Sequence, residues 1–342
     1  MNVRQPRISR PALRALAWSF VLLTLGLTAS CARDGRIEES KFVSLGGIEQ
    51  FVTIRGDRAT NPVLLILHGG PGAVQSPYAA VYELYEHEYT VVQWDQRGAG
   101  RTYGRYGEAT PDLTLDRLAA DGIELAEYLK KRFDNAKIIL LGHSWGSVVG
   151  VEMAKRRPDL FAAYVGTGQA SSWDRAVRFQ YDFVRAEARD KGNQAVLKTL
   201  KEPAAFDPRN TADYLSVNEP LTSRLLAKAD LEWYRSLPQR KSAATSAQEA
   251  KDIDAGQIFS GRKLQSAIFA EDLFSTASTF DIPFIVIQGS GDVIAPTPLV
   301  IDYFSRVQAP RKELRLIEGA GHFALVTHPS EFLAALGATI RR

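Results

Sequence analysis

The pentapeptide Gly-His-Ser-Trp-Gly at 142–146 is the segment whose residue types could most directly do chemistry. It follows an apolar run at 138–141 and precedes a helical pattern over 147–157. Small residues beside the serine permit a sharp turn between strand and helix, which holds the serine hydroxyl clear of the sheet. The helix also points the positive end of its dipole toward developing negative charge. Ser144 is therefore the predicted nucleophile.

A serine hydroxyl becomes a good nucleophile only when a base removes its proton, so the pattern requires an imidazole. The chain has five histidines, of which His322 comes late, in Gly-Ala-Gly-His at 319–322. This position fits the order serine, acid, histidine along the chain. His322 is the predicted base. We interpret His143 as a packing residue inside the turn, and His87 and His328 as surface residues.

The imidazole in turn needs a carboxylate that fixes its tautomer and stabilises its charged form. Asp292 follows an apolar run at 283–288 and lies between Ser144 and His322 in the sequence. Asp281 precedes that run and so belongs at the opposite end of the sheet, while Glu318 is the close rival because it is nearer to the histidine. Asp292 is the predicted acid.

A tetrahedral oxyanion needs two backbone N–H donors that are already in place. The segment His-Gly-Gly-Pro-Gly at 68–72 directly follows the apolar run 63–67, where glycine lets a substrate carbonyl approach the backbone. We expect the amides of Gly70 and of Trp145, the residue after the serine, to form this oxyanion hole. The alternative interpretation of the glycine segment is a tight turn without a catalytic role.

These residues must be positioned by an alternation of strands and helices. Apolar runs at 63–67, 90–94, 138–141 and 161–165 predict strands that are covered on both faces, as in a parallel sheet. Leucines at helical spacing predict a helix over 114–133. Gly46 and Gly47 separate two further predicted strands, at 41–45 and 50–55, in a hairpin.

Residues 171–280 interrupt this alternation with charged, amphipathic helical stretches, for example at 173–191 and 221–237. The alternation returns at 283–288, 298–306, 313–317 and 329–341. The fold class is therefore α/β: a doubly wound, mostly parallel, eight-stranded sheet with a helical cap inserted between strands 6 and 7. The expected divisions are a signal peptide (1–30), a tether (31–40), a core (41–170 and 281–342) and the cap (171–280).

The N-terminal segment has the layout of a secretory signal peptide: arginines, an apolar stretch at 15–27, then small residues before Cys31. The apolar stretch is shorter than the ~20 residues of a membrane-spanning helix. Cys31, the only cysteine, resembles the lipidation cysteine of bacterial lipoproteins, although Thr28 departs from that motif. We expect an anchor at Cys31 that holds the protein in the bacterial cell envelope, on the periplasmic side of a membrane. The alternative is ordinary cleavage near Ala29 or Ala32.

The net charge of +3 does not indicate a nucleic-acid partner. Four arginines precede Cys31, and without them 38 of the 42 basic residues remain against 39 acidic ones. The remaining chain is close to neutral. No metal-ligand motif is visible in the sequence, and we expect no cofactor.

Three motifs together resemble the proline iminopeptidase family of the α/β-hydrolases. They are His-Gly-Gly-Pro-Gly at 68–72, Asp-Gln-Arg-Gly-Ala-Gly-Arg at 95–101, and Gly-His-Ser-Trp-Gly-Ser at 142–147. The likeness covers residues 63–165 well and extends over 283–342 through Asp292 and His322. It implies the α/β-hydrolase fold and release of an N-terminal residue, preferably proline, from a peptide through an acyl-enzyme on Ser144.

The resemblance also implies cap carboxylates that bind the substrate's α-ammonium group. The typical members have a Trp-Glu pair, whereas this cap has Glu232 before Trp233, together with Glu219 and Asp230. These three acids are the predicted amine ligands. Two other functions stay open: a carboxylic ester or amide hydrolase of different specificity with an apolar pocket, and a binding lipoprotein that has lost catalysis.

Overall fold

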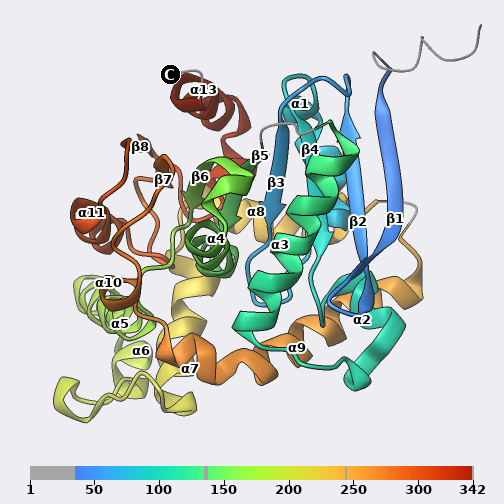
Figure 1. Ribbon diagram of the computed structural model, residues 1–342. Helices are drawn as coiled ribbons and strands as arrows, with labels where there is room; N and C mark the ends of the chain where they lie inside the picture. The colour runs from blue at the N-terminus through green and yellow to red at the C-terminus, as the bar shows by residue number, and fades with distance from the viewer. Residues whose placement is uncertain (1–34, 135–137, 243–244, 341–342) are drawn as a thin grey trace, which may run out of the picture.

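A computed structural model of the chain describes residues 35–134, 138–242 and 245–340, and a single sheet lies at its centre (Figure 1). In the described residues this sheet has eight strands in the order β1-β2-β4-β3-β5-β6-β7-β8. Strand β2 pairs antiparallel with β1 and β4, and the remaining neighbours are parallel. The strands are β1 (Ile37–Leu45), β2 (Ile48–Gly56), β3 (Val63–Leu67), β4 (Thr90–Asp95), β5 (Ile138–His143), β6 (Phe161–Thr167), β7 (Phe284–Gly289) and β8 (Lys312–Ile317).

The predicted mostly parallel, eight-stranded sheet is thus confirmed, and so is its first hairpin. Leu45 of β1 pairs with Ile48 of β2, which leaves a two-residue turn. Both turn residues have positive φ, 56° at Gly46 and 78° at Gly47. A turn of this kind is open to glycine without strain and matches the twist of the two strands.

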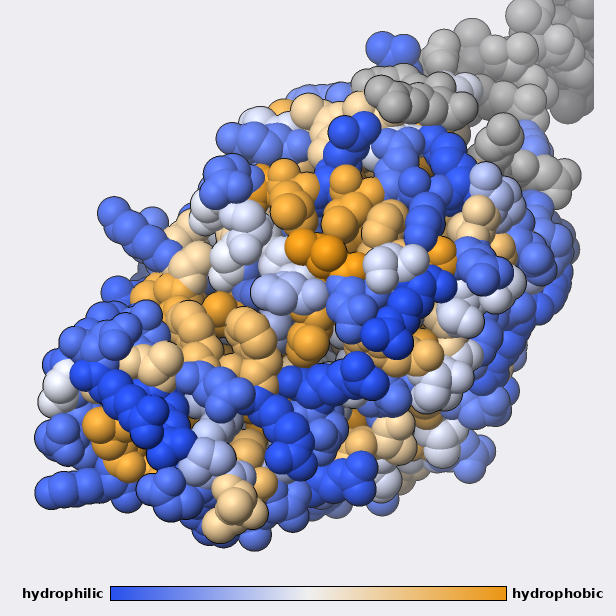
Figure 2. Space-filling model, turned by 90° about the vertical axis from the view of Figure 1, so that its left-hand side faces the viewer, coloured by the Kyte–Doolittle hydropathy of each residue, from blue (hydrophilic) through white to orange (hydrophobic). Residues whose placement is uncertain are grey.

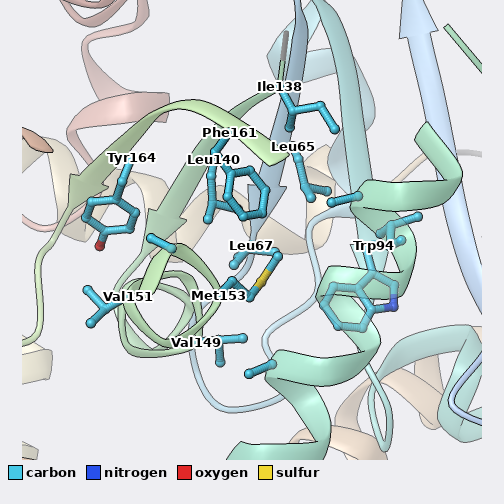
Figure 3. Packing of buried hydrophobic residues seen from close by; sticks show 14 of the residues in the cluster. Leu65, Leu67, Trp94, Ile138, Leu140, Val149, Val151, Met153, Phe161 and Tyr164 are labelled. Atoms are coloured by element: carbon cyan, nitrogen blue, oxygen red, sulfur yellow. The ribbon is translucent and has the colours of Figure 1, made fainter. Parts of the chain in front are cut away.

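The central strands are buried on both faces because they separate two apolar clusters. Leu65 and Leu67 of β3 belong to one cluster, whereas Leu64 and Ile66 belong to the other. Figure 3 shows the first cluster, where Leu140 of β5 and the two β3 leucines face the side chains of the following helix. Alternate strand residues point to opposite faces, which is why the apolar residues of β3 and β5 follow one another without alternation.

Helices cover both faces of the sheet and form the cap. The first cluster contains residues of α3, α4 and α11, and the second contains residues of α1, α12 and α13. The helices are α1 (Glu83–Glu86), α2 (Gly100–Tyr106), α3 (Leu115–Arg132), α4 (Trp145–Arg156), α5 (Trp173–Asp190), α6 (Gln194–Thr199), α7 (Thr211–Pro220), α8 (Lys228–Arg240), α9 (Ala247–Ala270), α10 (Leu273–Thr276), α11 (Thr297–Arg306), α12 (Ala324–Thr327) and α13 (Pro329–Ile340).

Helices α5 to α10 all come between β6 and β7, where the sequence predicts the cap. In Figure 1, α5, α6, α7 and α9 lie along the lower side of the molecule, at the end toward which β3 runs. In parallel sheets the carboxyl ends of the strands are where ligands bind. The cap therefore covers the edge of the sheet at which a site is expected.

Within the cap, the helical stretch predicted over 221–237 is helical in two pieces, with a break between them that the sequence did not predict. A π-helical turn at Leu221–Leu225 ends in extended backbone, with ψ of 158° at Leu226 and 142° at Ala227, and α8 begins only at Lys228. The side chain of Leu226 is buried in the apolar cluster of the cap, so packing overrides the helical pattern. The break sets the direction of α8 independently of α7.

Figure 2 shows the side of the molecule that carries α11 and β8, where apolar side chains form separate patches between polar ones. Strand β8 is the last strand of the sheet, and its charged residues Lys312, Glu313 and Arg315 oppose pairing with another chain. Among the described residues, no helix combines the length and apolar character needed to cross a bilayer. The predicted signal peptide and Cys31 lie outside the described residues.

Candidate active site

Ser144 occupies a strained turn between β5 and α4. Its φ of 54° and ψ of −124° lie in a region that residues with a side chain rarely adopt. The turn requires both glycines of the pentapeptide: a Cβ on Gly142 would lie 2.6 Å from the carbonyl oxygen of Gly146, and a Cβ on Gly146 would lie 2.2 Å from that of Leu67. The close contact between β5, α4 and β3 thus explains the Gly-x-Ser-x-Gly pattern.

His322 and Asp292 form a buried hydrogen-bonded pair after β8 and β7. Nδ1 of His322 donates to Oδ2 of Asp292 over 2.9 Å, and both residues are at most 3% exposed. Oδ1 of Asp292 also accepts from the amides of Ile294 and Ala295, over 2.8 and 2.9 Å. Nε2 of Gln288 donates to Oδ2 over 2.8 Å, so four donors hold the carboxylate. Because Nδ1 of His322 makes the bond to Asp292, Nε2 is the nitrogen that can act as a base.

The electrostatic surroundings of His322 keep it basic. Burial by itself lowers the pKa of this imidazole, but the charge of Asp292, its hydrogen bond and the charge of Asp230 outweigh burial and raise the pKa above the ordinary 6.5. The neighbouring His143 behaves in the opposite way, because burial and the charge of His322 lower its pKa to about 3. His143 is therefore neutral, and His322 is the member of the pair suited to proton transfer near neutral pH.

The predicted oxyanion-hole residues come from two separate elements. Gly70, in the loop after β3, has a φ of 111°, and a Cβ there would lie 2.6 Å from the amide nitrogen of Ala73. Trp145 is the first residue of α4, so its N–H has no acceptor within the helix. Both residues line the same cavity as Ser144 and His322.

This cavity, of about 450 Å³, lies between the sheet and the cap. Its lining is mainly apolar, and helices α5, α7 and α9 contribute Trp173, Tyr214, Ile268 and Phe269, next to polar residues such as Arg209 and Gln265. Trp173 packs against the rings of both Tyr214 and Phe269, at centroid distances of 5.1 and 5.7 Å. The cap thus provides an aromatic chamber next to the serine.

The structure does not bring two of the predicted amine ligands to this cavity. Glu219 is exposed at the end of α7, which presents Tyr214 and Leu215 to the cavity instead. The side chain of Glu232 is 64% exposed and pairs with Lys228 on the outer side of α8. The prediction for these two glutamates is therefore wrong, because the packing of their helices turns them toward solvent.

Asp230, the third predicted amine ligand, is buried and already has partners. Its carboxylate accepts hydrogen bonds from the backbone amides of His322 and Phe323. Burial raises the pKa of Asp230 above its ordinary value, and these two amides and the charge of His322 act against that change. Asp230 does not belong to the residues that line the cavity.

Glu271, after the last residue of α9, is the acidic residue that the cavity does contain and that the sequence reasoning missed. Its Oε1 is buried and has no hydrogen-bond partner among the described residues, and neither has Oδ1 of the adjacent Asp272. Burial, followed by the charge of Asp272, raises the pKa of Glu271 to about 8. The backbone amides of Trp173 and Leu273 act on the carboxylate and partly oppose this rise, but Oε1 stays unpaired, and a buried carboxylate oxygen without a partner is the kind of group that a cationic ligand would satisfy.

The Asp-Gln-Arg-Gly motif contributes to structure near the site. Arg97 is 1% exposed, and its Nε donates to Oδ2 of Asp121 on α3 over 2.7 Å. The guanidinium also donates to the carbonyl of Gly46 in the first hairpin, and Gln50 of β2 donates to the same carboxylate. Arg97 therefore connects the loop after β4 to α3 and the hairpin.

The remaining candidates lie away from the reacting groups. Glu318 and Asp281 are exposed, and His87 is exposed and pairs with Asp57. His328 is only half-buried and contacts Thr327, so its assignment to the surface holds in part. In the part of the chain that the structure describes, no group of three or more histidine, cysteine or acidic side chains is placed to hold a metal ion.

Comparison with known proteins agrees with this architecture. The sequence model of the α/β-hydrolase fold family matches residues 62–329. The chain belongs to this family. The match spans the sheet from β3 onward, the cap and the loops that carry Ser144, Asp292 and His322.

Among curated proteins, this α/β hydrolase is similar to a probable aminopeptidase of Bacillus subtilis, at 26% identity over 86% of this chain and 94% of the relative. It is also similar to a proline iminopeptidase of Lactobacillus helveticus, at 24% identity over 85% and 93% of the two chains. Among solved structures, a proline iminopeptidase-related protein of Thermus thermophilus matches with a TM-score of 0.65 and 21% identity, over 89% and 98% of the chains. The structural match shows the shared fold.

Proposed function

We propose that this hydrolase is a serine aminopeptidase that releases N-terminal proline, or another small residue, from peptides. The observation that carries the proposal is the unpartnered Oε1 of Glu271 in the same cavity as Ser144 and His322. An exopeptidase needs a charge that holds the free amino terminus of its substrate. The similarity to an aminopeptidase and to proline iminopeptidases supports the same substrate class.

In the proposed mechanism, Nε2 of His322 takes the proton of the Ser144 hydroxyl as the oxygen attacks the carbonyl carbon of the first peptide bond. The amides of Gly70 and Trp145 stabilise the oxyanion that forms. The imidazolium, stabilised by Asp292, then gives the proton to the departing amine, and the N-terminal residue stays on Ser144 as an ester. Water, deprotonated by His322, hydrolyses this acyl-enzyme and releases the free amino acid.

The cap provides recognition of the amino terminus in this proposal. The ammonium group of the substrate lies beside Glu271, and the positive charge favours the ionised carboxylate that burial disfavours. The rings of Trp173 and Phe269 enclose the side chain of the N-terminal residue. A peptide with a blocked amino terminus offers no ammonium group to Glu271. Its binding would leave Oε1 without a partner, so we expect blocked peptides to bind poorly.

The mainly apolar wall also favours a second candidate, hydrolysis of an ester or amide whose acyl group has no amine. A chain with the same fold that only binds ligands is the third candidate. The three functions depend on different residues. The aminopeptidase needs both Ser144 and the charge of Glu271, the ester hydrolase needs only Ser144, and the binding protein needs neither.

The deciding experiment compares proline p-nitroanilide with p-nitrophenyl butyrate as substrates of the purified protein. Ser144→Ala is expected to abolish both activities. Glu271→Gln is expected to raise KM for the prolyl amide about 100-fold or more, since a charged partner is lost, and to leave ester hydrolysis within about two-fold. Glu219→Gln, an exposed cap variant, serves as the matched control.

Ester hydrolysis that depends on Ser144, without any cleavage of prolyl amides, would assign the protein to the second candidate. Absence of both activities, together with no labelling of Ser144 by a fluorophosphonate probe, would favour the binding protein. Cleavage of the amide with an unchanged KM in Glu271→Gln would retain the aminopeptidase and remove Glu271 from its amine site.

We further propose that the protein is exported and lipid-anchored through Cys31, which supports a location in the bacterial cell envelope. Acyl chains contribute about 0.8 kcal/mol of membrane affinity for each buried methylene group. In cells fed labelled palmitate, the wild type is expected to take up label and to fractionate with membranes. Cys31→Ala is expected to do neither, and label on that variant would exclude Cys31 as the modified residue.

A further inference from the structure

Asp230 is the residue through which the cap contacts the backbone of the histidine loop. It lies in the first turn of α8 and is 1% exposed. Its Oδ2 accepts from the amide of His322 over 2.5 Å, and its Oδ1 accepts from the amide of Phe323 over 3.2 Å. Both oxygens are thus used by backbone donors of a loop 92 residues away in the chain.

His322 is held at three different atoms by three different parts of the molecule. Asp230 of the cap binds its amide, and Asp292 after β7 binds its Nδ1. Its carbonyl accepts from Nε2 of His143, in the turn beside Ser144, over 3.1 Å. The amide and the carbonyl fix the backbone, and Asp292 fixes the ring, so the direction of Nε2 follows from all three contacts.

Two further contacts show that the loop around His322 packs closely against Asp230 and helix α8. A Cβ on Gly321 would lie 2.1 Å from Oδ2 of Asp230, so the residue before His322 has no room for a side chain. One helical turn after Asp230, the ring of Tyr234 packs edge-on against Phe323 with a centroid distance of 4.9 Å. Helix α8 therefore contacts the loop both at and immediately after the histidine.

A buried carboxylate is costly unless hydrogen bonds or opposite charges compensate it. Here the compensation comes from the amides of the histidine loop and from the charge of the His322 ring when it is protonated. The same negative charge acts on the imidazolium that forms during catalysis, in addition to the charge of Asp292.

We propose that Asp230 is a positioning residue for His322, which couples the placement of the cap helix α8 to the placement of the base, and that it is not an amine ligand. This inference rests on the proposed role of His322 in a serine hydrolase, and it holds for any substrate class that the enzyme takes. It replaces the amine-binding role that the sequence predicts for Asp230.

The test compares Asp230→Asn with wild type on two substrates, proline p-nitroanilide and p-nitrophenyl butyrate, and measures the rate at which a fluorophosphonate probe labels Ser144. The variant keeps the side-chain volume but loses the charge and one acceptor. We expect kcat to fall about 10- to 100-fold on both substrates and labelling to slow in parallel, with KM for the prolyl amide within about two-fold. Glu232→Gln, on the exposed side of the same helix, is the matched control.

The pH dependence separates positioning from a merely structural role. The titratable groups that act on the His322 ring are Asp292, which binds Nδ1, Asp230, whose charge is close by, and His143, whose ring packs against it. Tyr234 of α8 packs against the adjacent Phe323. Loss of the Asp230 charge removes one of the two anions that raise the pKa of His322. The acid limb of kcat/KM is therefore expected to move to lower pH in Asp230→Asn.

Gly321→Ala provides a second variant for the case in which Asp230→Asn does not fold, because its methyl group displaces the Asp230 carboxylate. It is expected to lower kcat on both substrates in the same way. A raised KM for the prolyl amide with normal ester hydrolysis would overturn the proposal and make Asp230 an amine ligand. A lowered Tm with unchanged kcat and an unmoved acid limb would overturn it in favour of a structural role. If the wild type cleaves only esters, the peptidase function fails, and the ester kinetics still decide the role of Asp230.

Discussion

His322 donates from Nδ1 to Oδ2 of Asp292 over 2.9 Å, although the two residues are 30 positions apart and follow different strands. Strands β7 and β8 are parallel neighbours, so their carboxyl ends bring the two loops together at the same edge of the sheet. This relationship fixes which nitrogen of His322 carries a proton and which one can accept it.

Asp292→Asn is expected to lower kcat about 10³- to 10⁴-fold, because an amide facing Nδ1 favours the wrong tautomer of His322 and does not stabilise its cation. The remaining oxygen can still accept from the amides of Ile294 and Ala295, so the fold should be retained. Steady-state kinetics on either substrate and a circular dichroism spectrum check both parts. Glu318→Gln, the exposed alternative acid, should behave as wild type, and a large loss in that variant would contradict the assignment.

The acid limb of ester hydrolysis should report His322. The base must be neutral, and its pKa is raised above 6.5 by the two carboxylates that outweigh burial. Activity is therefore expected to be full at alkaline pH and to be lost as the pH falls through a value above 6.5. A pH profile of kcat/KM on p-nitrophenyl butyrate measures this loss of activity. An acid limb well below pH 6.5 would show that burial outweighs the two carboxylates in setting the pKa of His322.

Hydrolysis of prolyl amides should depend on pH in a second way, through the ionisation of Glu271. The carboxyl group, whose pKa is raised to about 8 by burial and by Asp272, binds an ammonium ion best when it is ionised. The pair requires the carboxylate to be ionised and the substrate amine, whose ordinary pKa is about 8, to be protonated. KM for proline p-nitroanilide should therefore be lowest near pH 8 and rise toward acid pH as Glu271 is protonated, and toward alkaline pH as the amine loses its charge. The ester KM should stay flat, and Glu271→Gln should remove the difference between the two profiles.

The backbone strain at Ser144 predicts a stability difference between two inactive variants. A positive φ with a side chain costs about 1–3 kcal/mol, whereas glycine tolerates it. Ser144→Gly is expected to have a higher Tm than Ser144→Ala, although glycine increases the entropy of the unfolded chain. Differential scanning calorimetry compares them, and a lower Tm for the glycine variant would argue against strain at this turn.

The buried ion pair of Arg97 and Asp121 should contribute to stability and not to substrate binding. Arg97→Met leaves the Asp121 carboxylate buried with fewer partners, which is expected to cost about 3–5 kcal/mol of unfolding free energy. KM should be unchanged in the folded fraction. Arg178→Ala breaks an exposed pair with Asp174 and should cost about 0.5 kcal/mol or less. Urea unfolding of both variants measures the contrast, and equal losses would contradict it.

The sequence by itself determined the features that depend on local geometry. Apolar runs without alternation specify strands buried on both faces, and the glycines around Ser144 reflect a turn in which a Cβ meets the backbone of a neighbouring strand. The order of Ser144, Asp292 and His322 along the chain follows from the connection of the strands, which is why these candidates could be named before the fold was known.

Only the tertiary structure decided which cap residues face the cavity. Glu219, Asp230, Glu232 and Glu271 all stand in charged, helical sequence, and nothing in their local pattern says which way each helix is turned. The break at Leu226 sets the direction of α8, so that Asp230 meets the His322 loop while Glu232 meets solvent. Glu271 became visible as a candidate only because burial leaves one of its oxygens without a partner, a property of the packed cap and not of any segment of the chain.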